Sequence, residues 1–229
     1  MTARVVGLRH PYAWVCFVIL AATMGAVTLV LILRLCIVLR SHDVKPRESL
    51  SLLIVAGSGG HTTEILRLVG SLSSAYSPRH YIIADTDTMS ANKINSFEHD
   101  RVDRDSSALS SSYHIHRIPR SREVHQSWLS TACSTLRSLW LSFPLVHGIK
   151  PDLVLCNGPG TCVPVCVSAL LLGVLGIKKV IIVYAESICR VETLSLSGKI
   201  LFYLSDYFIV QWPTLKEKYP KSVYLGRIV

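Results

Sequence analysis

Residues 50–61 read LSLLIVAGSGGH, and this stretch decides how the rest of the chain is interpreted. The run from Leu50 to Ala56 is short and almost wholly apolar, which is typical of a strand buried on both faces of a parallel sheet. It ends in the glycine turn Gly57–His61. Residues 62–72 then place apolar side chains at helical spacing, and Glu64 falls in the predicted first turn, where its charge favours the helix dipole. The stretch therefore predicts a strand, a tight turn and a helix.

The same alternation continues to the end of the chain. We predict further strands at 81–85, 114–118, 153–156 and 179–184, two more at 207–210 and 223–225, and helices at 90–97 and 128–143. Strands that alternate with helices predict a single Rossmann-like α/β domain with a doubly wound parallel sheet. Ligands of such sheets bind where the strands end. One edge should therefore carry Gly57–His61, Asp85, Asn157–Thr161 and Glu186.

Two apolar segments within this domain need a placement. Residues 128–143 form one apolar helical face, which we interpret as facing the core, with a face lying on a membrane as the alternative; its members are Leu129, Ala132, Cys133, Leu136, Leu139 and Trp140. Residues 162–177 are apolar all round, but they contain Pro164, Gly173 and Gly176 and lead directly into a strand. A buried helix covering the sheet is favoured there over a second membrane span.

A membrane anchor is expected near the N-terminus. The chain has 229 residues, 50% hydrophobic and 17% charged, with a mean hydropathy of +0.40, which excludes a disordered chain. Ala13 to Leu33 contains no charged residue and is long enough to cross a hydrocarbon core of about 30 Å. A cleaved signal peptide is the alternative, although its apolar region would be shorter.

The charges beside this segment predict its orientation. Arg34, Arg40, Lys45 and Arg47 follow it, whereas Arg4 and Arg9 precede it, so the positive-inside rule places the C-terminal part in the cytosol. The net charge of +9 is partly due to these flanks, which makes it weak support for nucleic-acid binding. We expect a lumenal N-terminus at 1–12, a transmembrane helix at 13–39, a juxtamembrane linker at 40–49 and a cytosolic domain at 50–229.

The seven cysteines give no disulfide pattern. Cys156, Cys162 and Cys166 are the closest group, but no Cys-x2-Cys pair or neighbouring histidine supports a metal site. We expect buried, reduced thiols and no metal.

The turn at Gly57–His61 is suited to phosphate, because glycines let backbone amides approach an anion at a helix N-terminus. The dinucleotide fingerprint Gly-x-Gly-x-x-Gly requires glycine at its sixth position, where this chain has Thr62. Asp85 ends the second predicted strand, where a ribose-binding acid would lie, so a nicotinamide enzyme remains an alternative. The lysine of a phosphate-binding Walker loop is missing. A turn that serves only tight packing is a third reading. Asn157-Gly158-Pro159-Gly160-Thr161 is a second such turn, and the two facing one crevice are suited to a diphosphate.

Titratable side chains near these turns are candidates for chemistry. His61 is the candidate general base, since its ordinary pKa lies near neutrality. Glu186 is either an active-site carboxylate or an acid at the start of a helix. Arg117, Arg120 and Arg122, with nearby histidines 114, 116 and 125, form a basic cluster that is either solvated or in contact with phosphates or a membrane.

These motifs together resemble a known family. The turns quoted above and Tyr184-Ala185-Glu186-Ser187 resemble the N-terminal half of two-domain (GT-B) glycosyltransferases that act on polyprenyl-diphosphate sugars. Residues 50–229 with the anchor are similar to the membrane-anchoring subunits of the eukaryotic UDP-GlcNAc transferase of dolichol-linked oligosaccharide synthesis. Further support comes from Asp85-Thr86-Asp87, Arg117-Ile118-Pro119-Arg120 and Tyr224-Leu225-Gly226-Arg227.

The resemblance implies a heterodimer at the cytosolic face of the endoplasmic reticulum. A soluble partner would supply most of the UDP-GlcNAc site, since the residues after the anchor suffice for only one of the two domains that this architecture needs. This chain would present GlcNAc-diphosphate-dolichol for protein N-glycosylation, would be inactive alone, and would use no metal or cofactor. A pure membrane scaffold without a chemical role is the alternative.

The resemblance also assigns roles to residues. His61 would act as the base, with Glu186 orienting the sugar or supporting the base. The acceptor diphosphate would lie on Gly57, Ser58, Gly59, Gly60, Asn157, Gly158, Gly160 and Thr161. The partner would contact the C-terminal residues Tyr224, Leu225, Gly226, Arg227, Ile228 and Val229.

Overall fold

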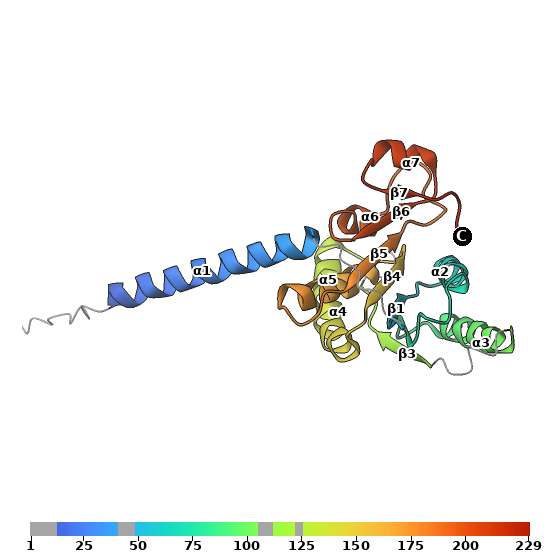
Figure 1. Cartoon of the computed structure of the whole chain (residues 1–229). Helices are drawn as coiled ribbons and strands as arrows, with labels where there is room; N and C mark the ends of the chain where they lie inside the picture. Colours follow the sequence, from blue (N-terminus) through green and yellow to red (C-terminus); the bar gives the residue numbers. More distant parts are fainter. Residues whose placement is uncertain (1–12, 41–48, 105–111, 122–125) are drawn as a thin grey trace, which may run out of the picture.

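A computed structural model describes residues 13–40, 49–104, 112–121 and 126–229. Seven strands form one sheet in the order β3-β2-β1-β4-β5-β6-β7, and every neighbouring pair is parallel (Figure 1). The strands are β1 (Leu52–Val55), β2 (Arg79–Ala84), β3 (Tyr113–Ile118), β4 (Leu153–Asn157), β5 (Ile181–Ala185), β6 (Tyr207–Val210) and β7 (Val223–Tyr224). The predicted doubly wound parallel sheet is confirmed.

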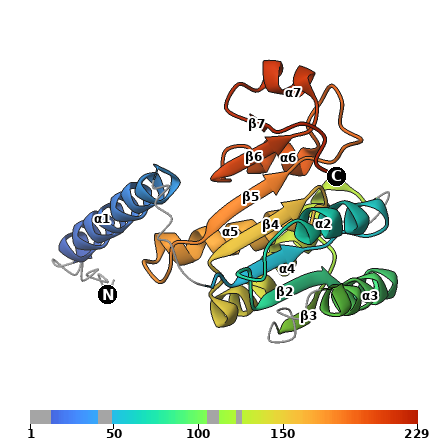
Figure 2. The ribbon, with the colours of Figure 1, turned by 45° about the vertical axis from the view of Figure 1, so that its right-hand side comes forward.

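Helices cover both faces of the sheet (Figure 2). On one face, α2 (Gly60–Gly70) and α3 (Thr88–Arg104) enclose a core that contains Ile65 and Ile94. On the other face, α4 (Trp128–Ile149) and α5 (Cys162–Val174) contribute to a larger core with α6 (Leu196–Leu201) and α7 (Pro213–Lys218). The four residues of β1 are completely buried between these layers, as their uninterrupted apolar sequence predicts.

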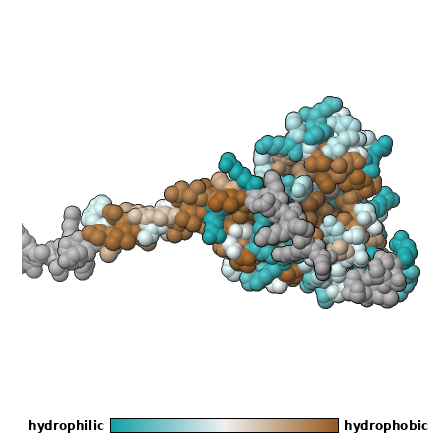
Figure 3. All heavy atoms as spheres, viewed as in Figure 1, coloured by the Kyte–Doolittle hydropathy of each residue, from teal (hydrophilic) through white to brown (hydrophobic). Residues whose placement is uncertain are grey.

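The apolar helix near the N-terminus, α1 (Ala13–Arg40), is 28 residues long, and its composition allows it to cross a membrane. Figure 3 shows its apolar surface projecting from the domain. Its last turns pack on α5, because Val38 is buried in the core shared by α4 and α5. Lys179 Nζ donates to the Val38 carbonyl over 2.7 Å and pairs with Asp206. The predicted N-terminus at 1–12 and most of the linker at 40–49 lie outside the described residues.

The predicted burial of the α4 apolar face is wrong. Leu129, Leu136 and Trp140 are 85%, 65% and 80% exposed, and Ala132 and Cys133 are exposed as well, whereas Leu139 is half-buried. The opposite stripe carries Ser138 and Ser142, which are fully buried. Small serine side chains allow the helix to approach the domain closely, and their hydroxyls find acceptors in Pro119 O and Ser138 O. Helical periodicity therefore identified the apolar stripe of α4 correctly but did not show whether that stripe faces the core or the solvent.

The second apolar helix agrees with its prediction. Most of α5 is buried, and within the described ranges α1 alone is long and apolar enough to span a membrane. The cysteines follow their predicted burial only in part: Cys156, Cys162 and Cys166 are buried, but Cys16, Cys36, Cys133 and Cys189 are exposed. Burial raises the pKa of the Cys156 and Cys162 thiols, so they stay protonated.

Candidate functional site

The two glycine turns lie side by side because β1 and β4 are neighbours in the sheet. Val55 pairs with Cys156 at the carboxyl ends of these strands. The chain leaves β1 toward one face of the sheet and β4 toward the other, so a crevice opens between the two turns. A cavity of about 620 Å³ occupies this position. Its walls include Gly57, Ser58, His61, Gly158, Pro159, Gly160 and Thr161.

Two of the glycines are required by close contacts. A Cβ on Gly57 would lie 2.8 Å from the His61 Cβ and 2.9 Å from a Pro159 ring carbon. Gly158 has a φ of +72°, and a Cβ there would lie 2.6 Å from the His61 Nδ1. The second turn thus lies directly against the histidine of the first. Close packing of the two turns against each other therefore requires glycine at both positions.

Hydrogen bonds determine which His61 nitrogen carries the hydrogen of the neutral ring. His61 Nδ1 lies 3.3 Å from Asn157 Oδ1, and Asn157 Nδ2 donates to the Ala185 carbonyl over 3.3 Å. Because the amide nitrogen is committed to a carbonyl, Oδ1 accepts, so Nδ1 carries the hydrogen of neutral His61. Nε2 then keeps its lone pair, as a general base requires. The Asn157 side chain, predicted to bind diphosphate, is fully buried and orients His61.

Glu186 is buried at the end of β5, beneath a second, smaller cavity. Its Oε2 accepts from Ser195 N at 3.0 Å and Ser195 Oγ at 3.1 Å, and its Oε1 accepts from Ser187 N at 3.2 Å. Burial raises the pKa of the Glu186 carboxyl above its ordinary value, although these donors and Arg190 oppose the shift. A Cβ on Gly198 would overlap the carboxylate. Glu186 therefore holds the loop between β5 and α6 in place.

Positive potential gathers at the first turn. Helix α2 begins at Gly60, and its N-cap Gly59 offers no side chain to the backbone N–H groups of the first turn. These N–H groups form an anion site by their orientation and by the helix dipole. Arg120 lines the same cavity, and its buried Nε has no hydrogen-bond partner among the described residues. The Arg120 guanidinium and the α2 N-terminus together suit a phosphate group.

The other members of the basic cluster are dispersed. Arg117 is exposed and donates to the Asp85 carbonyl over 2.8 Å. His116 pairs with His80 at 3.1 Å on β2 and β3, and burial together with the two neighbouring histidines lowers the pKa of His80 to about 4. Arg122 and His125 lie outside the described residues. Asp85, predicted to lie at the same edge as the glycine turns, is exposed at the end of β2 and lines neither of the two cavities described here.

The C-terminal segment begins on the edge strand β7, at the edge of the sheet opposite β3, and then turns back to Trp212 and Gln211, which follow β6. Tyr224 and Leu225 are 39% and 64% exposed. Arg227 stacks over the Trp212 ring at 5.2 Å, and Ile228 N donates to Gln211 Oε1 over 3.2 Å. The segment thus has an ordered backbone and exposed apolar side chains, which is suitable for contact with another protein.

Sequence reasoning missed the role of Glu64. The residue does not lie in the first turn as predicted, because α2 begins at Gly60 and its first turn contains no acidic residue. Instead it lies one turn beyond His61 and lines the smaller cavity of about 310 Å³ with Glu186, Arg190 and Ser195. The spacing of three residues from His61 was the available signal, since it places both side chains on one helix face.

Comparison with known proteins gives the family. The sequence profile described as "Oligosaccharide biosynthesis protein Alg14 like" matches residues 52–228. The chain is 80% identical over 215 residues to the Homo sapiens "UDP-N-acetylglucosamine transferase subunit ALG14", covering 94% of this chain and 100% of the human protein. It is 44% identical to the Schizosaccharomyces pombe protein with the same description, covering 82% of this chain and 87% of that one.

A solved structure supports the fold alone. MurG of Acinetobacter baumannii matches with a TM-score of 0.51 at 15% identity, over 72% of this chain and 42% of MurG. The predicted similarity to one half of that architecture is therefore confirmed. With the profile spanning nearly the whole domain and curated relatives matched over nearly their full lengths, the chain belongs to the Alg14 family of oligosaccharide biosynthesis proteins.

Proposed function

We propose that this chain is the acceptor-binding, membrane-anchored subunit of a UDP-GlcNAc transferase that extends GlcNAc-diphosphate-dolichol at the cytosolic face of the endoplasmic reticulum. Family membership and the descriptions of its relatives support the reaction class and argue against a nicotinamide enzyme. The observation that carries the assignment of the site is His61, which lines the cavity between the two glycine turns and whose Nδ1 lies within hydrogen-bond distance of Asn157 Oδ1.

The residues suit a direct displacement with inversion. The 4-hydroxyl oxygen of the acceptor GlcNAc attacks C1 of the donor sugar, the bond from C1 to the UDP oxygen breaks, and UDP leaves with the electron pair. His61 Nε2 takes the proton of the attacking hydroxyl. The α2 N-terminus, the amides of the two glycine turns and Arg120 hold the lipid diphosphate. Glu186 keeps the loop that carries Ser195 in position beside the acceptor sugar.

The donor half comes from a separate polypeptide in this proposal. The human relative is matched over its entire length by this one-domain chain, and it is described as a subunit. The exposed side chains of Tyr224 and Leu225 on the edge of the sheet are the proposed contact with that partner.

Reconstitution tests the proposed function. Full-length chain in liposomes, the soluble donor-binding subunit, and both together are assayed for transfer of radiolabelled GlcNAc to GlcNAc-diphosphate-dolichol. We expect transfer only with both proteins, because neither contains the whole cleft. Robust transfer by this chain alone would refute the half-site assignment.

The C-terminal contact is tested in the same system by co-purification. We expect loss of residues 224–229, or Leu225→Asp, to reduce recovery of the partner about tenfold or more, since a charge replaces an exposed apolar contact. Tyr113→Ser on the opposite edge strand is the matched control and should have no effect. Full association after the deletion would move the interface elsewhere.

The exposed face of α4 is the proposed second contact with the membrane. Leu129, Leu136 and Trp140 are exposed on α4, and α4 covers the same side of the sheet as α5, on which the end of α1 packs through Val38 (Figure 1). A soluble surface rarely keeps so many large apolar side chains on one stripe, whereas a helix lying in a membrane interface does. The larger cavity reaches Thr131 and Thr135, which lie on the opposite, domain-facing stripe of α4, so the same helix borders the diphosphate site on one side and presents this apolar face on the other.

Cys133 on this face reports its surroundings. The full chain in vesicles, with Cys16 and Cys36 changed to serine, is labelled with a fluorophore at Cys133 or at Cys189, both exposed. We expect brominated lipids to quench the Cys133 probe several-fold more than the Cys189 probe. Leu136→Glu with Trp140→Glu should abolish that difference. Equal quenching in the unaltered chain would show that α4 faces water.

A further inference from the structure

Glu64 has an unexplained buried oxygen beside the proposed acceptor site. The residue is 9% exposed, and its Oε1 accepts from Ser187 Oγ over 2.8 Å. Its Oε2 is buried and has no hydrogen-bond partner within the described ranges. A buried carboxylate oxygen without a donor is costly to the folded state. Such an atom at the wall of a cavity indicates that a bound ligand supplies the donor.

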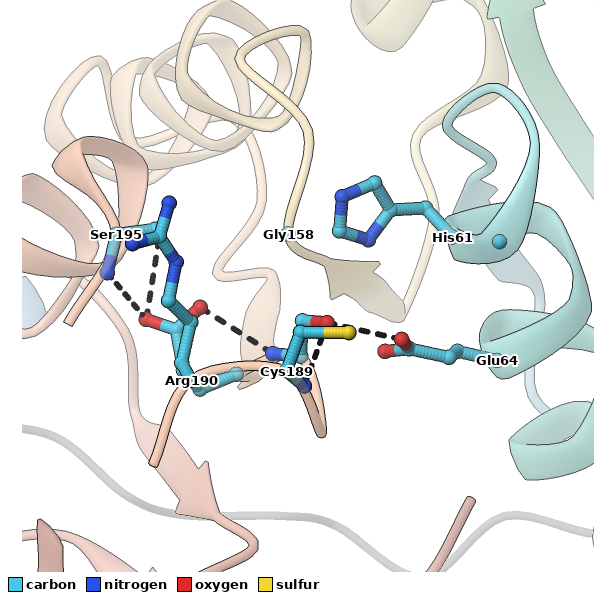
Figure 4. Close-up of a pocket in the computed structure, with 9 residues that line it drawn as sticks. His61, Glu64, Gly158, Cys189, Arg190 and Ser195 are labelled. Atoms are coloured by element: carbon cyan, nitrogen blue, oxygen red, sulfur yellow. Dashed lines mark hydrogen bonds between the residues drawn. The ribbon is translucent and has the colours of Figure 1, made fainter. Parts of the chain in front are cut away.

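The direction of the side chain supports this interpretation. Figure 4 shows His61 and Glu64 projecting from one helix toward the opposite wall, where Cys189, Arg190 and Ser195 lie. Ser187 is 4% exposed and itself accepts from Cys189 N at 3.3 Å, so it anchors the Glu64 Oε1. With Oε1 occupied in this way, Oε2 is left as the acceptor for a ligand in the cavity.

An unpaired carboxylate oxygen suits a ligand that carries an N–H or O–H donor. Over the described residues, no group of three or more histidines, cysteines or acidic residues could hold a metal ion. His61 and Glu64 are three residues apart on α2, so their Cβ atoms lie about 5–6 Å apart. This separation lets one sugar ring contact both side chains, with its reacting hydroxyl at His61 Nε2 and a neighbouring substituent at Glu64 Oε2.

We propose that Glu64 is an acceptor-binding residue, whose Oε2 accepts a hydrogen bond from the acetamido N–H or the 3-hydroxyl of the acceptor sugar. This inference rests on the proposed function and deepens it, since it names the group that recognises the sugar rather than the diphosphate. Hydrogen bonds to a charged group are stronger than those between neutral groups. An acceptor sugar that lacks the donor group would leave Glu64 Oε2 unpaired, so this contact discriminates between acceptors.

Glu64→Gln is the informative substitution. Glutamine keeps the size of the side chain and its carbonyl oxygen can still accept from Ser187, but it presents NH₂ to the cavity in place of Oε2. In the reconstituted two-subunit enzyme, we expect KM for the acceptor to rise about tenfold or more, while KM for UDP-GlcNAc and the unfolding temperature stay unchanged. Ser187→Ala, which removes the hydroxyl that bonds Glu64 Oε1 and Cys189 N but leaves Glu64 Oε2 in place, should have the smaller effect.

Acceptor analogues complete the test. With an acceptor whose sugar lacks the acetamido group or the 3-hydroxyl, whichever donates, wild type and Glu64→Gln should bind equally well, because the interaction is already gone. Equal acceptor KM values for wild type and Glu64→Gln with the natural acceptor would overturn the inference, as would a loss that is the same with every analogue. Wild-type transfer to the natural acceptor supports the proposed function in either case, and its absence would overturn both.

Discussion

Replacement of His61 by alanine should lower the rate of GlcNAc transfer by about 10²- to 10⁴-fold, the usual contribution of a positioned general base. The expectation follows from the hydrogen bonds of His61. Asn157 is fixed by the Ala185 carbonyl, and it holds the hydrogen of neutral His61 on Nδ1, so Nε2 is ready to accept a proton. The measurement is kcat in the reconstituted two-subunit enzyme with saturating UDP-GlcNAc and acceptor.

A matched control separates chemistry from assembly. His99 on α3 is 80% exposed and distant from the glycine turns, so His99→Ala should leave transfer unchanged. His61→Ala should also co-purify normally with the donor subunit, since His61 lies away from the C-terminal edge strand. If His61→Ala transfers GlcNAc at the wild-type rate in an intact complex, the chain is a membrane scaffold and the base lies elsewhere.

The sheet and its site edge could be predicted because they depend on short-range patterns. The apolar run before Gly57 and the glycine turn after Cys156 each specify a buried strand followed by a close backbone approach, and parallel pairing then brings the two turns together. The expected edge was confirmed for both turns and for the end of β5. The alternation of strands and helices leaves few topologies open, although it does not by itself give the strand order.

The surroundings of individual side chains could not be predicted in the same way. Periodicity on α4 identifies an apolar stripe, but burial depends on which stripe meets the sheet, and the serine stripe does so here. Glu64 was predicted to lie in the first turn of its helix and to favour the helix dipole, but α2 begins at Gly60, so Glu64 lies in the second turn. Asn157 was predicted to bind diphosphate, yet its side-chain amide bonds to His61 and to a neighbouring strand. Asn157 and His61 are 96 positions apart in the sequence, so this contact depends on the fold.

The second large effect is expected from Gly158→Ala. The residue has a φ of +72°, which costs an alanine about 1–2 kcal/mol, and the added Cβ would overlap the His61 ring. The ring must rotate away, which breaks its hydrogen bond to Asn157 and removes Nε2 from the acceptor. We therefore expect a loss of transfer approaching that of His61→Ala, measured as kcat/KM for the acceptor, with a fall of a few degrees in the unfolding temperature.

Gly148→Ala provides the matched control for that substitution. Gly148 lies in α4, its φ is not positive, and a Cβ there would meet nothing within 4 Å, so transfer should be unchanged and stability equal or higher. The comparison isolates the contact between the two turns, because both variants add one methyl group and one of them displaces His61. If Gly158→Ala retained full activity, the second turn would not constrain the histidine. The crevice would then bind the acceptor by its amides alone, with the proton taken by a group from the partner.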